Sequence, residues 1–356
     1  MRATRLICVL LVTLLSLTLT LAQQTSENNE RLQEYLRSFP GADADGDGVL
    51  TMEEAQAHNQ RRQEARQAQQ EYEAGRPDPD VADLAYGPFE RNVLDLWLAR
   101  APEGAQGPRP LAVFIHGGGW VGGDKSGISR RDLEALLAAG ISVAAVNYRY
   151  STQAPFPAPM TDAGRAIQFL RYHAAEYDLD PTRIGAWGGS AGATTCMWLA
   201  FHDDLADPEA EDPVLRESTR LTAIAPVAGP TTLEVDVGQE WLGAPLSKHA
   251  ALMTMFGVED VSGLDDPTVQ AQMAEASPIN HLGPEDDVPT YMRYSQPDTQ
   301  LDETATPGEV AHHPRYGVHL KAKMDALGIE CVLIYPDHDS DDPYGSLVEF
   351  FKAKLL

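Results

Sequence analysis

The serine at position 190 carries the strongest catalytic signature in this chain of 356 residues. An apolar strand pattern at 183–187 runs directly into the sequence GGSAG at 188–192, and a helix pattern follows at once. A G-x-S-x-G sequence between a strand and a helix holds its serine in a strained turn, with the hydroxyl exposed at the carboxyl end of a sheet. The pattern therefore predicts that Ser190 is a nucleophile for acyl transfer.

A run of glycines further upstream predicts the backbone N–H donors that acyl transfer also needs. The sequence HGGGW at 116–120 follows another apolar strand pattern. Attack on an ester carbonyl creates an oxyanion, and glycines let backbone N–H groups turn toward it without side-chain clashes. We expect the amides of Gly118, Gly119 and Ala191 to form the oxyanion hole, and His116 to support the loop structurally.

The elements that must position these groups follow from the hydrophobic pattern. From residue 86 onward, short apolar strand patterns alternate with amphipathic helix patterns, which predicts an α/β fold with a mostly parallel sheet. The expected strands are 92–98, 111–115, 141–147, 183–187, 221–227, 290–294 and 331–335. The expected helices are 130–139, 158–177, 191–202, 315–327 and 346–356. Residues 231–282 show no strand pattern, and we expect them to form a helical, cap-like insertion over the site.

These motifs resemble those of the HGGG-type α/β-hydrolases, and among them the bacterial carboxylesterases related to feruloyl and acetylxylan esterases. The resemblance covers residues 86–356 and rests on three stretches. They are HGGGWVGGDK at 116–125, NYR at 147–149 with FPAP at 156–159 and Asp162, and DPTRI at 180–184 leading into GGSAG. The resemblance implies an α/β-hydrolase fold with a nucleophile, an acid and a histidine in that chain order. The second half of the region follows the family pattern less closely.

The resemblance also implies a position for the triad acid. Counting along the family pattern from Pro289 places Asp298 at the carboxylate that would orient the histidine. Asp302 is the close competitor, and an aspartate in such a turn is often only a turn former.

The family's base follows the last strand, and His338 is the histidine at that place. It comes earlier after the strand than is usual in the family. His312 and His313, directly before the helix expected at 315–327, are therefore the alternatives. If none of the three serves, the domain would be catalytically damaged.

A second kind of chemistry is predicted by the acidic stretch DADGDGVLTMEE at 43–54. Its spacing fills a twelve-residue EF-hand loop, in which a hard Ca²⁺ ion finds several oxygen ligands. The expected ligands are Asp43, Asp45, Asp47, the Val49 carbonyl, Thr51 and Glu54. Gly48 would allow the sharp turn of the loop, and Leu50 would point inward. Only one such loop is visible, so a structural role for calcium is the expected one.

The amino terminus is typical of a secretory signal peptide. Arg2 and Arg5 precede an apolar run at 6–21, and Ala22 marks the expected cleavage point. An uncleaved membrane anchor is the alternative interpretation. Cleavage would leave a periplasmic or secreted protein, and the loss of two arginines would change the net charge from −26 to −28. Such acidity argues against nucleic acid or an anionic membrane surface as a partner.

The expected organisation is a signal peptide at 1–22, a calcium-binding module at 23–75, a linker at 76–85 and the hydrolase domain at 86–356. The two cysteines after the signal, Cys196 and Cys331, sit in apolar surroundings, which predicts buried free thiols. The sequence does not fix the oligomeric state.

The combined interpretation is a secreted serine carboxylesterase that acts on short-chain esters through an acyl-enzyme, with Ser190, Asp298 and His338 as the triad. By resemblance, acetylated or feruloylated polysaccharide fragments are candidate substrates, and the chemistry needs no cofactor. One alternative is an amidase or peptidase of the same fold. Another is a calcium-dependent binding protein with an inactive hydrolase domain.

Overall fold

The computed structural model describes residues 24–100, 107–338 and 341–356. The expected signal peptide and its cleavage point lie outside these residues. The chain divides into two compact units, Met1–Arg76 and Pro77–Leu356, and each is described here by itself. Within the described residues, no helix has the combination of length and apolar character needed to cross a membrane.

The larger unit is built on an eight-stranded sheet with the order β1-β2-β4-β3-β5-β6-β7-β8. Strands β3 to β8 pair in parallel, whereas β1 and β2 join the edge beyond β4 in antiparallel fashion. The strands are β1 Val81–Ala85, β2 Val93–Trp97, β3 Arg109–Ile115, β4 Ser142–Val146, β5 Leu179–Gly189, β6 Ala223–Val227, β7 Thr290–Arg293 and β8 Cys331–Ile334. The central strands are buried on both faces, as a parallel sheet between helical layers requires.

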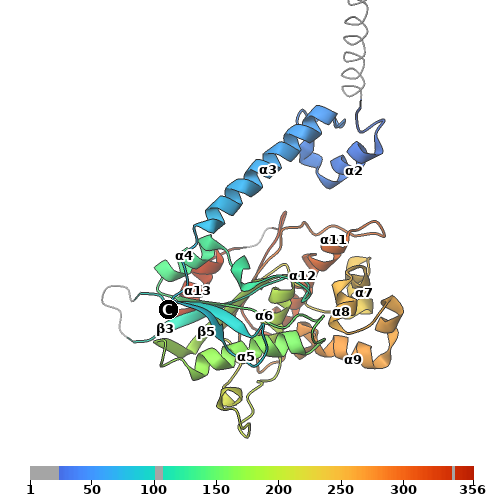
Figure 1. Cartoon of the computed structure of the whole chain (residues 1–356). Coiled ribbons are helices and arrows are strands. Elements are labelled where there is room, and N and C mark those ends of the chain that lie inside the picture. The colour runs from blue at the N-terminus through green and yellow to red at the C-terminus, as the bar shows by residue number, and fades with distance from the viewer. Residues whose placement is uncertain (1–23, 101–106, 339–340) are drawn as a thin grey trace, which may run out of the picture. The chain divides into compact units, whose positions relative to one another are not determined.

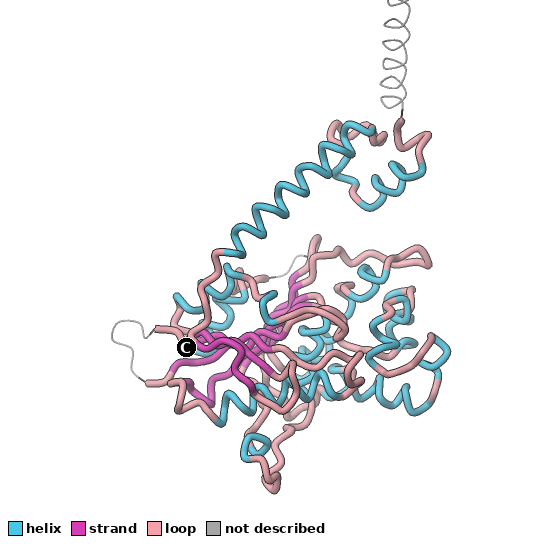
Figure 2. The backbone as a smooth tube through the Cα atoms, in the orientation of Figure 1, coloured by secondary structure: helices cyan, strands magenta, loops and turns pink. Residues whose placement is uncertain are grey.

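Helices cover both faces of this sheet (Figures 1 and 2). On one face, α4 (Arg130–Ala138) and α13 (Leu347–Leu355) bury Leu133, Phe350 and Phe351. On the other face, α5 (Ala158–Tyr172), α6 (Ala191–Phe201) and α12 (Arg315–Leu327) contribute to the larger apolar core. The result is a three-layer α/β/α arrangement, which confirms the predicted fold class.

The segment 231–282 is helical, as expected. Its elements are α7 Val235–Leu242, α8 Ala251–Met255, α9 Pro267–Glu275 and α10 Pro278–His281, with short 3₁₀ turns at Leu246–Lys248 and Val261–Asp265. Further 3₁₀ turns lie at Lys125–Gly127 and Pro213–Arg216. Leu233, Leu242, Leu246 and Leu252 join the main core, so the insertion is packed against the domain by its own apolar side chains.

Two short elements differ from the sequence prediction. Strand β1 lies inside the stretch 76–85 that was expected to be a linker, and it forms an edge of the sheet. Helix α11 (Pro307–Ala311) was not predicted, and it ends immediately before His312. Both elements have five residues, too short for a hydrophobic period to identify them.

The smaller unit contains α2 (Glu30–Ser38), a 3₁₀ turn at Pro40–Ala42 and the long helix α3 (Met52–Ala74). Asn29 caps the first helix, and Thr51 with Glu54 forms a capping box at the start of the second. The unit has a small apolar core, which includes Leu32 and the fully buried Leu50. Leu50 therefore points inward, as the acidic-loop pattern predicted.

Cys196 and Cys331 are buried free thiols in the larger unit. Burial raises the pKa of both groups, so neither is poised to react as a thiolate. This confirms the expectation from the sequence.

Candidate active site

Ser190 lies in a tight turn between the end of β5 and the start of α6. Its backbone has φ 54° and ψ −121°, in the left-handed half of conformational space that side chains other than glycine seldom adopt. The neighbouring glycines are required by the crowding, because a Cβ at Gly188 would lie 2.2 Å from the Ile115 carbonyl oxygen, and one at Gly192 2.0 Å from it. This is the strained turn that the motif predicted, and its serine is partly buried.

The histidine beside this serine is His312. Its Nε2 lies 2.9 Å from the Ser190 Oγ, which is hydrogen-bonding distance for a base that takes the hydroxyl proton. His312 follows α11, whose start is fixed by a capping box between Thr306 and Glu309 with Pro307 at its first position. That T-P-G-E pattern was the sequence signal that could have located this helix.

The preference for His338 therefore has to be corrected. The ring of His338 stacks on Tyr335 at 4.3 Å between centroids, and its Nδ1 is buried without a hydrogen-bond partner among the described residues. Only Pro336 and Asp337 separate the two residues, and the backbone N–H of His338 turns back to the Tyr335 carbonyl at 3.4 Å. The turn is too short to carry the imidazole away from the strand end.

Asp298 does not contact the histidine at the serine either. Its carboxylate pairs with the Arg315 guanidinium at 2.7 Å, and Arg315 also donates to the Gln300 side chain. The competitor Asp302 is exposed and accepts from the backbone and hydroxyl of Thr304, which is a turn-forming role. Among the described residues, no carboxylate is hydrogen-bonded to His312.

His313, the third candidate for the base, makes hydrogen bonds to the backbone. Its Nε2 donates to the Thr299 carbonyl at 2.8 Å, and its Nδ1 accepts from the Arg315 backbone N–H at 3.2 Å. Both ring nitrogens are therefore occupied in fixing the start of α12.

The glycine loop after β3 lies next to the serine turn. A Cβ at Gly117 would come within 2.5 Å of the Gly189 carbonyl oxygen, so the two loops touch backbone to backbone. Gly118 and Gly119 have φ of 106° and 60°, and neither amide donates a backbone hydrogen bond to a described residue. Ala191 is the first residue of α6, where an amide has no partner within the helix. The arrangement is compatible with three donors converging on an oxyanion.

His116 is held away from proton transfer. Its Nδ1 donates to the Gly117 carbonyl at 2.7 Å, and its ring stacks on Tyr148 at 4.2 Å. Burial lowers the pKa of His116 to about 4, so the ring is neutral at ordinary pH. The hydroxyl of Tyr148 donates to the His116 carbonyl at 2.8 Å, which ties the loop to the segment after β4.

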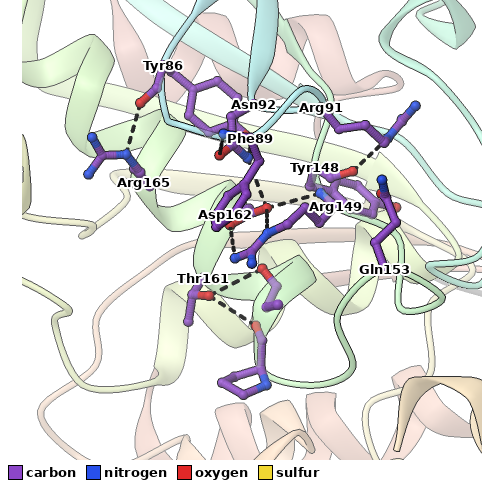
Figure 3. A network of polar contacts seen from close by, with 12 residues as sticks. Tyr86, Phe89, Arg91, Asn92, Tyr148, Arg149, Gln153, Thr161, Asp162 and Arg165 are labelled. Atoms are coloured by element: carbon purple, nitrogen blue, oxygen red, sulfur yellow. Dashed lines mark hydrogen bonds and ion pairs between the residues drawn. The ribbon is translucent and has the colours of Figure 1, made fainter. Parts of the chain in front are cut away.

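Figure 3 shows the polar network behind that segment. Asp162 accepts from the Arg149 guanidinium through both carboxylate oxygens, at 2.8 and 2.7 Å, and from the Asn92 amide at 2.9 Å. Arg91 donates to the Tyr148 carbonyl at 2.8 Å. Through Tyr148, this buried network positions the loop that carries Gly118 and Gly119.

Two recesses meet at Ser190. The first has apolar walls drawn largely from the insertion. It is lined by Gly119, Trp120, Ser190, Ala191, Pro230, Leu233, Leu246, His249, Ala251, Leu252 and Ala311. The second is wider and includes His312, Phe114, Asp132, Ser295 and Leu347. The insertion therefore lies over the site, as expected.

The environment of His312 keeps its imidazole neutral. Burial lowers the pKa of His312, and the positive charge that His249 can carry lowers it further. A neutral imidazole at the serine hydroxyl is the form that accepts a proton.

The acidic loop of the smaller unit has a folded arrangement of oxygens. Asp43, Asp45 and Asp47 each offer a carboxylate oxygen, and these oxygens lie within 4.8 Å of one another. Asp43 accepts from the backbone of Gly46 and Gly48, both at 2.8 Å, and Gly48 has φ 85°. The loop therefore gathers like charges at one point, which is unfavourable without a cation.

The other two side chains expected as ligands also face this loop. Glu54 accepts from the Ala44 backbone N–H at 3.1 Å and from Thr51 Oγ1 at 2.7 Å, and the Thr51 contacts lower the pKa of Glu54. Val49 bonds through its N–H to Asp47, leaving its carbonyl available. The residues present fit an oxygen-ligated cation.

The second half of the loop has a partner within the same chain. Thr25 and Thr51 form an antiparallel bridge, and the Ser26 backbone N–H donates to the Leu50 carbonyl at 2.8 Å. Residues 24–26 therefore run antiparallel to this part of the loop.

Comparison with known proteins agrees with this fold and geometry. Curated relatives include the probable carboxylic ester hydrolase LipM and the esterase LipQ, both of Mycobacterium tuberculosis. LipM is 33% identical over 41% of this chain and 34% of its own length, and LipQ is 29% identical over 57% and 45%. The chain thus spans less than half the length of either relative.

Solved structures show the same fold. A truncated carbohydrate esterase from gut microbiota has a TM-score of 0.55 at 21% identity, and covers 72% of this chain and 86% of its own. An acetyl ester-xyloside bifunctional hydrolase from Caldicellulosiruptor lactoaceticus has a TM-score of 0.56 at 21% identity, with 74% and 88% covered. The BD-FAE family model matches residues 94–312, more than half of the chain, and includes both Ser190 and His312. The chain therefore belongs to the BD-FAE family and has the α/β-hydrolase fold.

Proposed function

We propose that this protein is a serine carboxylesterase in which Ser190 and His312 act as nucleophile and base. The observation that carries the proposal is the 2.9 Å contact between His312 Nε2 and Ser190 Oγ, in a turn strained as a nucleophile requires. The esterase names of its relatives support the same class of reaction.

The proposed reaction begins when Ser190 Oγ attacks the ester carbonyl carbon and its proton passes to His312. The amides of Gly118, Gly119 and Ala191 stabilise the oxyanion that forms. His312 then gives the proton to the departing alcohol, leaving an acyl-enzyme on Ser190. Water then attacks this ester while His312 takes its proton. Collapse of the second oxyanion breaks the bond to Ser190 Oγ, which takes the proton back from His312, and the carboxylic acid is released.

The shape of the two recesses supports short acyl groups as substrates. The apolar recess beneath the insertion adjoins Gly119 and Ala191, so it suits the acyl group of the ester. The wider recess beside His312 suits the alcohol, including a carbohydrate. Acetylated or feruloylated saccharides are the first natural esters to test. A feruloyl group is larger than an acetyl group and would need more room in the apolar recess.

The class of reaction is tested with the purified full chain. It should hydrolyse p-nitrophenyl acetate faster than an aminopeptidase substrate, and Ser190→Ala should remove the ester activity. Faster turnover of the amide would favour a peptidase, whereas ester turnover that survives in Ser190→Ala would refute the proposed nucleophile.

The acyl recess is tested with a series of p-nitrophenyl esters. Leu252→Ala enlarges the apolar recess and should shift the preference from acetate toward longer acyl chains. Leu347→Ala makes the same deletion in the wider recess and should leave the acyl preference unchanged. Equal shifts in both variants would contradict the assignment of the two recesses.

We also propose that the acidic loop binds Ca²⁺ in a structural role, and that the protein acts in the periplasm or outside the cell. The fit of oxygens from residues 43–54 supports the first part. The residues at 1–22 that predict export support the second. Expression with the complete amino terminus, followed by mass determination of the exported product, tests cleavage after Ala22, and an intact mass would contradict it.

A further inference from the structure

A second cluster of metal-binding side chains lies at the far end of the nucleophile helix. His202 follows the last residue of α6, Glu275 ends α9, and His281 ends α10. One ring nitrogen of each histidine and one carboxylate oxygen lie within 4.8 Å of one another. Twelve residues separate His202 from Ser190, so the cluster is about 18 Å away from the serine along the helix.

Each ring nitrogen of His202 faces an oxygen atom, but a neutral ring has only one proton to donate. Its Nδ1 lies 2.8 Å from the Asp203 carbonyl oxygen, and its Nε2 lies 2.9 Å from the Glu275 carboxylate. Both oxygens only accept, whereas a neutral imidazole carries one proton. With the Nδ1 proton on the Asp203 carbonyl, the Nε2 lone pair faces the Glu275 carboxylate, and a cation bound between them would satisfy both.

The second histidine has a lone pair to offer as well. His281 Nε2 lies 2.6 Å from the Glu275 carbonyl, so this nitrogen donates and the other ring nitrogen carries the lone pair. The two imidazole centroids are 4.7 Å apart. Each ring thus has one N–H fixed on a backbone carbonyl, which is the support that metal-bound histidines usually have.

The frame around these groups is rigid although the carboxylate can move. Trp198 packs on the His202 ring at 4.2 Å between centroids and donates its indole N–H to the Glu275 carbonyl at 3.0 Å. Arg220 donates to the His202 carbonyl at 3.0 Å. The Glu275 side chain is 52% exposed, so it can approach an ion without disturbing the core.

We propose that His202, Glu275 and His281 form a Zn²⁺ site that fastens the helical insertion to the nucleophile helix. Two imidazoles and one carboxylate are a ligand set that zinc prefers, with water in the fourth position. Oxygen-seeking Ca²⁺ and Mg²⁺ are poorly matched to it. The bound ion joins the carboxyl end of α6 to α9 and α10, and so stabilises the insertion whose residues wall the acyl recess.

The test uses the full chain without a polyhistidine tag, stripped with a chelator and then kept in excess Ca²⁺ to occupy the acidic loop. Competition against a chromophoric chelator should show about one equivalent of Zn²⁺ bound per chain, with a rise in Tm. Replacement by Co²⁺ should give the visible absorption of a tetrahedral site. Absence of zinc binding, or of any rise in Tm with zinc, would overturn the proposal.

Substitutions of the three proposed ligands test where the zinc ion binds. His202→Asn, His281→Asn and Glu275→Gln should each weaken zinc binding at least about tenfold. His173→Asn is the matched control, because His173 forms a similar 2.9 Å pair with Glu176. It should bind zinc like the wild type. Wild-type affinity in the three ligand variants would place the ion elsewhere and refute the site. If a histidine variant fails to fold, the exposed Glu275→Gln substitution decides by itself.

Discussion

At the scale of single residues, the proposed chemistry rests on a serine and a histidine, and among the described residues no carboxylate stands behind that histidine. Asp298 is paired with Arg315 at 2.7 Å, and no described carboxylate is hydrogen-bonded to His312. A carboxylate normally stabilises the imidazolium that forms during catalysis. Here burial and His249 act in the opposite direction and lower the pKa of His312.

The lowered pKa of His312 determines how the reaction depends on pH. Only neutral His312 accepts the serine proton, so activity is present above its pKa and is lost as pH falls through it. Because that pKa lies below the ordinary value of 6.5, kcat/KM should fall to half of its plateau value only at a pH below 6.5. His249→Gln should move the decline upward toward 6.5. A half-maximal value at a pH above 6.5 would contradict the environment described for His312.

Asp298 pairs with Arg315 and not with His312, so its charge should matter little for catalysis. Asp298→Asn should lower kcat less than about tenfold, against about 10⁴-fold where a triad carboxylate orients the base. The half-exposed pair with Arg315 should contribute at most about 1 kcal/mol to stability. Steady-state kinetics on p-nitrophenyl acetate measure the effect, and a loss of more than a hundredfold would restore Asp298 as the acid.

The sequence predicted the nucleophile and glycine motifs because both are local. Ser190 and its glycines, like Gly118 and Gly119, are constrained by turns between adjacent elements. The histidine comes from a distant segment, and its approach depends on how the chain after β7 folds back. The family's order, with the base after the last strand, therefore led to His338, whereas the tertiary fold brings His312 to the serine.

At the scale of elements, the oxyanion loop depends on a buried polar network rather than on its own contacts alone. Asp162, near the start of α5, holds Arg149 and Asn92, and Tyr148 reaches from the same segment to the His116 carbonyl. Most strands were predicted within a few residues of their bounds. Two elements were not predicted, the strand β1 and the helix α11. Edge pairing holds β1 and a capping box starts α11, and neither has a long hydrophobic pattern.

Disrupting this network should cost stability and activity together. Asp162 is buried, so Asp162→Asn leaves the Arg149 charge without its partner and should lower the free energy of unfolding by about 3 kcal/mol. Asp180→Asn removes the local, more exposed pair with Arg183 and should lower it by less than about 1 kcal/mol. Urea unfolding compares the two variants, and equal losses would contradict a special role for the network.

At the scale of the whole molecule, the chain combines a hydrolase unit with a small unit that has its own core. The acidic-loop pattern predicted the inward position of Leu50. It could not predict that residues 24–26 would pair with Leu50 and Thr51 of the loop. This pairing satisfies backbone groups that a lone loop would expose.

Calcium should stabilise the small unit without entering the chemistry. Titration of the full chain with Ca²⁺ should show about one bound ion, slower proteolysis within 24–75 and unchanged ester turnover. Glu54→Gln should abolish these effects, because it removes the charge and one acceptor of the bidentate ligand. Glu53→Gln, at the exposed neighbouring position, is the control. Loss of turnover on calcium removal would contradict a purely structural role.

The central claim is that His312 is the base for Ser190, and paired alanine variants test it most directly. His312→Ala should lower kcat on p-nitrophenyl acetate by about 10²- to 10⁴-fold, as loss of a general base does. His338→Ala, measured beside it with folding checked by thermal melting, should retain most of the activity. The reverse result, an active His312→Ala and an inactive but folded His338→Ala, would contradict the account.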